Sequence, residues 1–321
     1  MATIAENIQT LRSIKSDLKN AITNKGGSVG NDFKTYAQAI TNLPSGGGGG
    51  GTEIEDALVM RTLSGTYYNN RVSRVANYAF YDCGFLTSIN LPNCSYVSHD
   101  AFTLCTNLTS ISLPNCTSVG SSAFYYCRGL PSIDLPLCTS VGSSAFYYCS
   151  SLTTVNLPNC TYVGNDVFFS CKSLTSVNIP LCSSAGRGAF RNCSLLTTVN
   201  LPICSTIGDV AFYDCYSLTS VNLPICSTIG DMAFYDCSNL TQVYLNSVSS
   251  VTDMMYSNTF SNCPKLTSVY VPASLVDAFK TALNWSSISD KIVAYREIAN
   301  IGPGDFDHGG VGGEDTDVPI E

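Results

Sequence analysis

Apolar and polar positions in the middle of the chain follow a pattern that repeats every 22 residues. One unit, residues 86–107, reads LTSINLPNCSYVSHDAFTLCTN, and the next reads LTSISLPNCTSVGSSAFYYCRG. The alternation of Ile89 and Leu91 with Asn90 predicts a short strand with one apolar face. Pro92 ends the strand, because proline has no N–H for a ladder. Stacked units can bury the apolar face that one unit leaves exposed, so the pattern predicts a solenoid with one parallel sheet.

Each unit also contains the motif L-x-x-[IV]-x-[LI]-P-x-C, which is the leucine-rich-repeat pattern. The segment LPLCTSVGSSAFYYCSSLTTVNLP resembles the BspA-like leucine-rich repeats, whose hallmark is AFxxCxxL, and the resemblance covers residues 72–271. We therefore predict an α/β-repeat fold, a leucine-rich-repeat solenoid with a small all-α segment before it. The resemblance implies adhesion and binding rather than catalysis, in surface proteins of bacteria and protists or in phage-encoded proteins.

Residues 1–44 have a different pattern, with apolar side chains spaced by three and four residues. These positions are Ile4, Ile8, Leu11, Ile14, Leu18 and Ile22. The spacing predicts a helix, with a second one over residues 32–42. The pair forms either a hairpin closed on itself or an oligomerising segment, for which a trimer is favoured. The segment resembles the N-terminal attachment modules of phage fibre and tail-associated proteins, which implies contacts with other virion proteins.

The glycine-rich residues 45–52 are predicted to be a flexible linker between this helical segment and the solenoid of residues 53–271. Residues 272–298 break the repeat pattern and predict a C-terminal cap. Ser274 and Asp277 form a capping-box-like helix start. The cap is expected to cover the last repeat with Leu275, Phe279 and Leu283. The acidic, glycine-rich tail of residues 299–321 is predicted to be disordered.

Charge and hydropathy reduce the number of possible function classes. The formal net charge is −8 and only 12% of residues are charged, which argues against nucleic acid and against an anionic membrane surface. No apolar run reaches 18 residues, so no membrane insertion is expected. The first residues lack the basic start and apolar core of a secretory signal. We expect a protein made in the host cytoplasm and assembled into a virion there, without Sec-dependent secretion.

All sixteen cysteines occupy two rows of the repeat. Their separation of 11 residues within a repeat does not fit a structural zinc site, whose cysteines are two to four apart. Neighbours within a row would lie about 5 Å apart, inside the disulfide range, but parallel side chains point alongside each other. These observations favour buried free thiols over disulfides or metal ligation, and no cofactor is predicted. The rows are Cys83, Cys105, Cys127, Cys149, Cys171, Cys193, Cys215, Cys237 and Cys263, and Cys94, Cys116, Cys138, Cys160, Cys182, Cys204 and Cys226.

One feature of the sequence could support catalysis. It is a cluster of aspartates at equivalent positions of two adjacent repeats: Asp209, Asp214, Asp231 and Asp236. Stacked carboxylates about 5 Å apart could act as a glycosidase pair or hold a cation with oxygen ligands. The plainer explanation is that the two repeats are recent copies of each other. The two histidines, His99 and His308, suggest no nucleophile–base arrangement. We therefore predict that the chain is not an enzyme and holds no metal.

Two surfaces are candidates for binding. The outward strand positions carry threonine or asparagine and could hydrogen-bond a polysaccharide or be inert; they are Thr87, Thr109, Thr153, Thr175, Thr197, Thr219, Asn90, Asn156, Asn178, Asn200 and Asn222. An aromatic flank beside the core phenylalanines could form an interface or sugar platform, or could pack against neighbouring repeats. It comprises Tyr81, Tyr125, Tyr126, Tyr147, Tyr148, Phe169, Tyr213 and Tyr235.

Together these features predict a non-enzymatic phage structural protein, a fibre or decoration component of capsid or tail. Residues 1–44 would contact other virion proteins and favour a homo-oligomer. The repeats would bind a host-surface or mucosal glycan, or a protein. A bacterial BspA-like surface adhesin is the first alternative, and a polysaccharide-degrading enzyme is the second.

Overall fold

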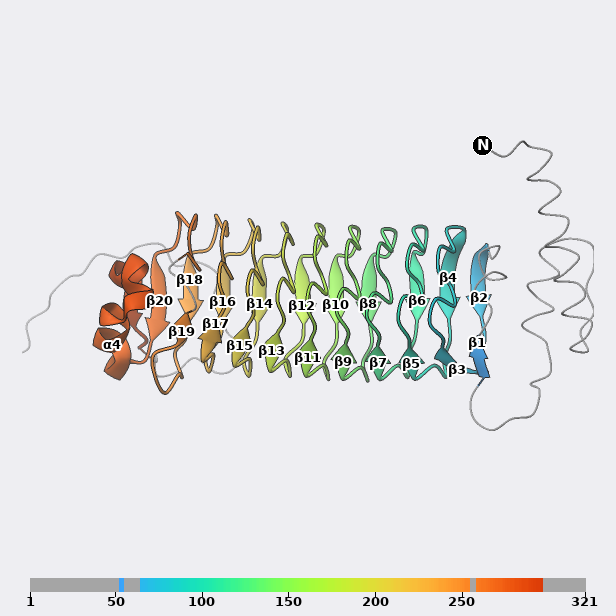
Figure 1. The fold of residues 1–321 in the computed structure, drawn as a ribbon, viewed down its shortest axis with the longest axis horizontal. Helices are drawn as coiled ribbons and strands as arrows, with labels where there is room; N and C mark the ends of the chain where they lie inside the picture. The colour runs from blue at the N-terminus through green and yellow to red at the C-terminus, as the bar shows by residue number, and fades with distance from the viewer. Residues whose placement is uncertain (1–51, 55–63, 255–257, 297–321) are drawn as a thin grey trace, which may run out of the picture.

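The computed structural model describes residues 52–54, 64–254 and 258–296, which form an elongated, nearly straight solenoid (Figure 1). Successive turns of the chain lie side by side along the long axis, from β1 at one end to α4 at the other. The predicted leucine-rich-repeat solenoid is therefore confirmed. The predicted helical segment of residues 1–44, most of the linker and the acidic tail lie outside the described residues.

Each repeat contributes two parallel strands, so two lines of strands run along the solenoid. The first strand line comprises β2 (Gly65–Tyr68), β4 (Leu86–Asn90), β6 (Ser110–Ser112), β8 (Ser132–Asp134), β10 (Thr154–Asn156), β12 (Ser176–Asn178), β14 (Thr198–Asn200), β16 (Ser220–Asn222), β18 (Gln242–Tyr244), β20 (Ser268–Val271) and β21 (Ile292–Ala294). This is the sheet that the sequence pattern predicts.

The second strand line was not predicted, and it forms a continuous ten-stranded parallel sheet. It comprises β1 (Thr52–Ile54), β3 (Val72–Val75), β5 (Tyr96–Val97), β7 (Ser118–Val119), β9 (Ser140–Val141), β11 (Tyr162–Val163), β13 (Ser184–Ala185), β15 (Thr206–Ile207), β17 (Thr228–Ile229) and β19 (Asp253–Met254). Most of these strands have only two residues, too short to show an alternation of apolar and polar positions.

The first strand line is interrupted twice, between β6 and β8 and between β12 and β14. At the first break, Pro131 occupies the position from which a backbone N–H would reach the carbonyl of Thr109, and proline has none. Thr153 makes the equivalent bond to Pro131 in the next repeat, at 2.8 Å. At the second break the equivalent residue is Thr197, and no sequence feature there explains the interruption.

A column of phenylalanines fills the centre of the solenoid, one from each repeat. The rings stack nearly parallel, from 4.8 Å between the centroids of Phe80 and Phe102 to 5.5 Å between those of Phe146 and Phe168. These rings are fully buried, together with the leucines and valines of both strand lines. Since each ring is covered by its neighbours on both sides, the repeats stabilise one another through this column.

The cysteines surround the phenylalanine column, and all sixteen are free and buried, as predicted. In the row that follows the core phenylalanine, each thiol from Cys105 to Cys263 donates to a carbonyl of an earlier repeat; Cys149 reaches the oxygen of Phe124 at 3.1 Å. In the other row, Cys138 donates to Ser140 at 3.3 Å. Burial raises the pKa of Cys138 to about 12, so the thiols stay protonated and are weak nucleophiles and weak metal ligands.

The C-terminal cap differs from the prediction in two respects. It contains η1 (Ala273–Leu275), α4 (Val276–Thr281) and η2 (Leu283–Lys291), and the N-cap of α4 is Leu275 without a side-chain bond, so the Ser274 capping box is wrong. Phe279 is buried as expected, but Leu283 is 84% exposed. Trp285 takes the predicted place of Leu283: it is buried, packs edge-on against Phe279, and donates to the carbonyl of Thr252 at 2.8 Å.

Candidate functional site

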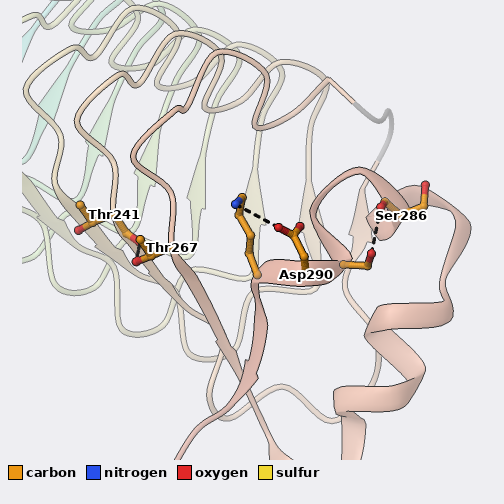
Figure 2. Close-up of polar contacts among 6 residues, drawn as sticks. Thr241, Thr267, Ser286 and Asp290 are labelled. Atoms are coloured by element: carbon orange, nitrogen blue, oxygen red, sulfur yellow. Dashed lines mark hydrogen bonds and ion pairs between the residues drawn. The ribbon is translucent and has the colours of Figure 1, made fainter. Parts of the chain in front are cut away.

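The outward face of the first strand line, here called the strand face, carries three rows of polar side chains. The threonine row that sequence analysis selected is bonded internally. Thr175 donates its hydroxyl to the carbonyl of Thr153 at 3.1 Å, and Thr267 bonds Thr241 in the same way at 3.1 Å (Figure 2). The same bond forms from Thr109, Thr153, Thr197, Thr219 and Thr241. These hydroxyl hydrogens are therefore not available to a ligand.

The asparagine row is also partly bonded internally. Asn156 donates to the carboxylate of Asp134 at 2.8 Å, and Asn222 donates to the side-chain oxygen of Asn200 at 3.0 Å. Asn178 continues the ladder by donating to Asn156 at 2.6 Å. Each amide uses one N–H for this ladder and keeps a second one, because a side-chain amide has two donors.

Between these rows lies a third, which sequence analysis missed. It consists of Ser110, Ser132, Thr154, Ser176, Thr198 and Ser220, here called the hydroxyl row. Five of the six are exposed and Ser220 is half-buried. Within the described residues none of these hydroxyls makes a hydrogen bond to another side chain or to the backbone. Each can therefore both donate to and accept from a ligand.

Tyrosines mark the two ends of this polar stretch. Tyr68, which pairs with Asn90 across the ladder, is 55% exposed at the N-terminal end. At the C-terminal end the rings of Tyr244 and Tyr270 stack with centroids 4.9 Å apart. The strand face is thus a hydroxyl and amide surface between two aromatic ends.

The predicted aromatic flank is also brought together by the fold. Its rings stack along the solenoid: Tyr147 lies 4.8 Å from Tyr125 and 4.6 Å from Phe169, with interplanar angles of 8° and 7°. Tyr126 and Tyr148 form a parallel stack beside them, also at 4.8 Å. Tyr213 stacks on Tyr235 at 4.9 Å. Tyr81 is separate, in edge contact with Tyr78.

Sequence analysis missed the residue that joins the two halves of this flank. Arg191 lies between Phe169 and Tyr213, with its guanidinium carbon 5.5 Å and 4.8 Å from the two ring centroids. Arg128 lies over Tyr126 in the same way, at 4.7 Å. The signal was present in the repeat alignment, because residue 191 occupies the column in which the neighbouring repeats place aromatic residues.

This stacking limits what the flank can bind. Sugar rings bind to open aromatic faces, but here the ring faces cover one another. Partial burial raises the pKa of Tyr147, and the neighbouring Tyr125 adds to the rise. The geometry thus supports the interpretation in which these rings pack against neighbouring repeats, and a ligand role for them stays a prediction.

The four aspartates are placed at the turns of two adjacent repeats. Asp209 accepts a 2.9 Å hydrogen bond from the backbone N–H of Asp231. In the same way, the side-chain oxygen of Asn165 accepts a 3.0 Å hydrogen bond from the backbone N–H of Arg187, so this position stabilises the turn in several repeats. Within the described ranges, no three histidine, cysteine or acidic side chains gather closely enough to hold a metal ion. The cation site therefore stays a prediction that rests on two aspartates from each repeat.

A shallow cleft of about 460 Å³ separates the last repeat from the cap. Its floor contains Phe260, Leu266 and Ile288, and the charged residues Asp236 and Lys291 line it. Lys291 is already paired with Asp290, at 3.3 Å from Nζ to Oδ2 (Figure 2). Among the described residues, no helix has both the length and the apolar character needed to cross a bilayer.

Several solved structures are similar to this chain at low sequence identity. No curated protein matches the chain. Among solved structures, a leucine-rich cell surface protein from Faecalibacterium prausnitzii is 21% identical, with a TM-score of 0.35, covering 74% of this chain and 86% of its own. A leucine-rich repeat protein from Bacteroides ovatus is also 21% identical, with a TM-score of 0.33, covering 74% and 85%. The pneumococcal vaccine antigen PcpA is 16% identical, with a TM-score of 0.44, covering 73% and 80%.

A family model described as a BspA type leucine rich repeat region matches residues 73–197 and 161–289, which together span more than half of the chain. The matched residues contain the phenylalanine column, both cysteine rows and most strands of both lines. The chain belongs to the BspA-type leucine-rich-repeat family.

Proposed function

We propose that this chain is a non-enzymatic binding protein of the adhesion type, and that its strand face holds an extended polar polymer such as a surface polysaccharide. The observation that carries the proposal is the hydroxyl row, in which Thr154, Ser176 and Thr198 stand exposed in three successive repeats with no internal partner. Where the strands pair, as they do for Ser132, Thr154 and Ser176, neighbouring hydroxyls are spaced by the strand separation of about 4.8 Å. A regular row of groups that donate and accept suits a ligand with regularly spaced hydroxyls.

The rest of the strand face supports the same ligand class. The free amide hydrogens of Asn156, Asn178 and Asn222 lie beside the hydroxyl row, and no lysine or arginine projects from it. The exposed ring of Tyr68 could contact a sugar face at the end of the row. A neutral polysaccharide fits this surface better than a polyanion does.

For the biological setting we propose a phage particle, in which the chain is a fibre or decoration component of capsid or tail. The support is the resemblance of residues 1–44 to phage attachment modules, which implies binding to other virion proteins and a homo-oligomer. Attachment to a bacterial surface fits the family equally well. Mass spectrometry of purified particles tests the phage setting: the chain should co-purify with capsid or tail proteins, and its recovery only from the bacterial surface would overturn it.

The ligand is tested by isosteric removal of hydroxyls. Thr154→Val with Thr198→Val should weaken binding of the full chain to host-surface polysaccharide roughly tenfold, because each lost hydrogen bond contributes about 0.5–1.5 kcal/mol. The matched control is Thr206→Val with Thr228→Val, which changes two partly exposed threonines on the second strand line. Equal binding by all three proteins would overturn the strand-face site. Sugar release by the wild type that is lost in Asp209→Asn with Asp231→Asn would overturn the non-enzymatic assignment.

A further inference from the structure

From Lys172 onward, after Asp166 of the same repeat, charged residues on the aromatic flank are separated by sign along the solenoid. The repeat that carries Arg191 also carries Arg187, and Lys172 precedes it. The next two repeats carry only acids at the corresponding turns: Asp209, Asp214, Asp231 and Asp236. No lysine, arginine or histidine occurs between residues 192 and 264. A basic stretch therefore lies directly beside an acidic one on the same side of the molecule.

These opposite charges do not neutralise each other within the chain. Although adjacent repeats are only about 4.8 Å apart, neither Arg187 nor Arg191 forms an ion pair with Asp209 or Asp214 within the described residues. Arg191 is held over the rings of its neighbours, and Asp209 is turned toward the backbone of the next repeat. Both stretches thus keep their charge for an external partner.

We propose that this flank docks a second copy of the chain in an antiparallel arrangement, with the twofold axis between the repeat of Arg191 and the repeat of Asp209. A twofold axis at that point places the basic stretch of each copy against the acidic stretch of the other, so the patch is self-complementary. Arg187 and Arg191 then face Asp209 and Asp214 of the second copy, and Lys172 faces Asp236. A parallel arrangement would instead place like charges opposite each other.

The uncharged part of the flank suits the same interface. Tyrosine edges and hydroxyl groups line the row between the charges, and tyrosine and arginine are enriched where proteins meet. Complementary charges around them would fix the register and speed association. The flank is separate from the hydroxyl row, which belongs to the first strand line, so the dimer does not depend on the proposed ligand.

The test uses the full chain and its mass in solution by sedimentation velocity. Lys172→Glu with Arg191→Glu reverses two charges of the basic stretch, and Asp214→Lys with Asp236→Lys reverses the two acidic charges that they face; all four positions avoid the core. Each variant should weaken the association at least tenfold and halve the mass at concentrations where the wild type is paired. An equimolar mixture of the two variants should restore the wild-type mass, which also shows that both are folded.

Lys280→Glu, on the exposed side of α4, is the matched control and should leave the mass unchanged. The charge-reversed variants should have half the wild-type mass whether or not residues 1–44 also oligomerise. If those residues do oligomerise, the flank joins the resulting oligomers in pairs. A wild type whose mass does not change with concentration or with these variants would overturn the proposal. So would a mixture that fails to associate although both variants show the wild-type circular dichroism spectrum.

Discussion

The thiol of Cys127 donates a 3.0 Å hydrogen bond to the backbone carbonyl of Phe102, 25 residues earlier in the chain. The same bond recurs along the whole row, from Cys105 to Cys263. The oxygen of Phe102 also accepts from the backbone N–H of Cys105 at 3.1 Å, so each cysteine of this row both fills space and gives a buried carbonyl its second donor. That dual role explains why a residue with reactive chemistry is used here without any reactive function.

Alkaline pH should destabilise the solenoid steeply. Burial raises the pKa of Cys116, Cys138 and Cys226 to about 12 from an ordinary value of 9.0. Above pH 9 the unfolded chain loses thiol protons that the folded chain keeps, so the unfolded state is favoured by about 1.4 kcal/mol per thiol per pH unit. The stabilising effect is complete below pH 9 and is lost toward pH 12. Urea unfolding between pH 7 and 11 measures it.

A control separates the thiols from the tyrosines, which also titrate in this range. Cys138→Ala with Cys182→Ala should reduce the number of protons released on unfolding above pH 9 by close to two. The slope of unfolding free energy against pH should fall in proportion. A slope unaffected by these substitutions would contradict the assignment.

Two neighbouring phenylalanines allow the stabilising effects of core packing and surface stacking to be compared. Phe168 belongs to the buried column, and Phe168→Ala should cost about 3–5 kcal/mol in unfolding free energy because it leaves a cavity. Phe169 stacks on the flank and is half-buried, so Phe169→Ala should cost about 1–2 kcal/mol. Denaturant titration compares the two; equal costs would mean that the flank stack contributes as much as the column.

Close approach of successive coils makes one glycine row intolerant of substitution. A Cβ atom on Gly208 would lie 2.6 Å from the backbone nitrogen of Arg187, so Gly208→Ala should force the coils apart and cost about 1–3 kcal/mol. At Gly84 the nearest atom to an added Cβ is 4.0 Å away, so Gly84→Ala should change the melting temperature little. Similar losses at both sites would point to backbone flexibility rather than contact between coils.

The turns contain a site where stability should increase. Val210 has a φ of 50°, a left-handed conformation that is costly for a β-branched residue. Earlier repeats place Asp100, Ser122 or Ser144 at this position with a similar φ. Val210→Asn should raise the unfolding free energy by about 0.5–1 kcal/mol, since asparagine tolerates this conformation. Thermal melts against wild type measure the gain, and a loss would mean that the valine packing outweighs the strain.

The parts of the structure that sequence predicted are those that depend on the repeat period. Ile89 and its equivalents define the first strand line, and the phase of the cysteines with Phe80 places both in the core. By contrast, Arg191 joins the aromatic flank through Phe169 and Tyr213, which lie 22 residues before and after it. Only an alignment of the repeats places these three residues in one column. The threonine row and the hydroxyl row are adjacent in sequence and similar in composition. Which hydroxyl turns toward a backbone carbonyl depends on strand geometry, and Trp285 lies where periodicity has ended.

The hydrogen bonds between repeats have a genetic consequence. From Thr109 to Thr241, the hydrogen bonds that join coils recur with the 22-residue period of the repeat, so each coil offers its successor the same set of donors and acceptors. Insertion or loss of one whole 22-residue unit reconnects the ladder without leaving an unpaired group, whereas any other length breaks it. Unequal recombination between near-identical repeats can therefore lengthen or shorten the rod in fixed steps, and with it the reach of whatever surface the rod presents.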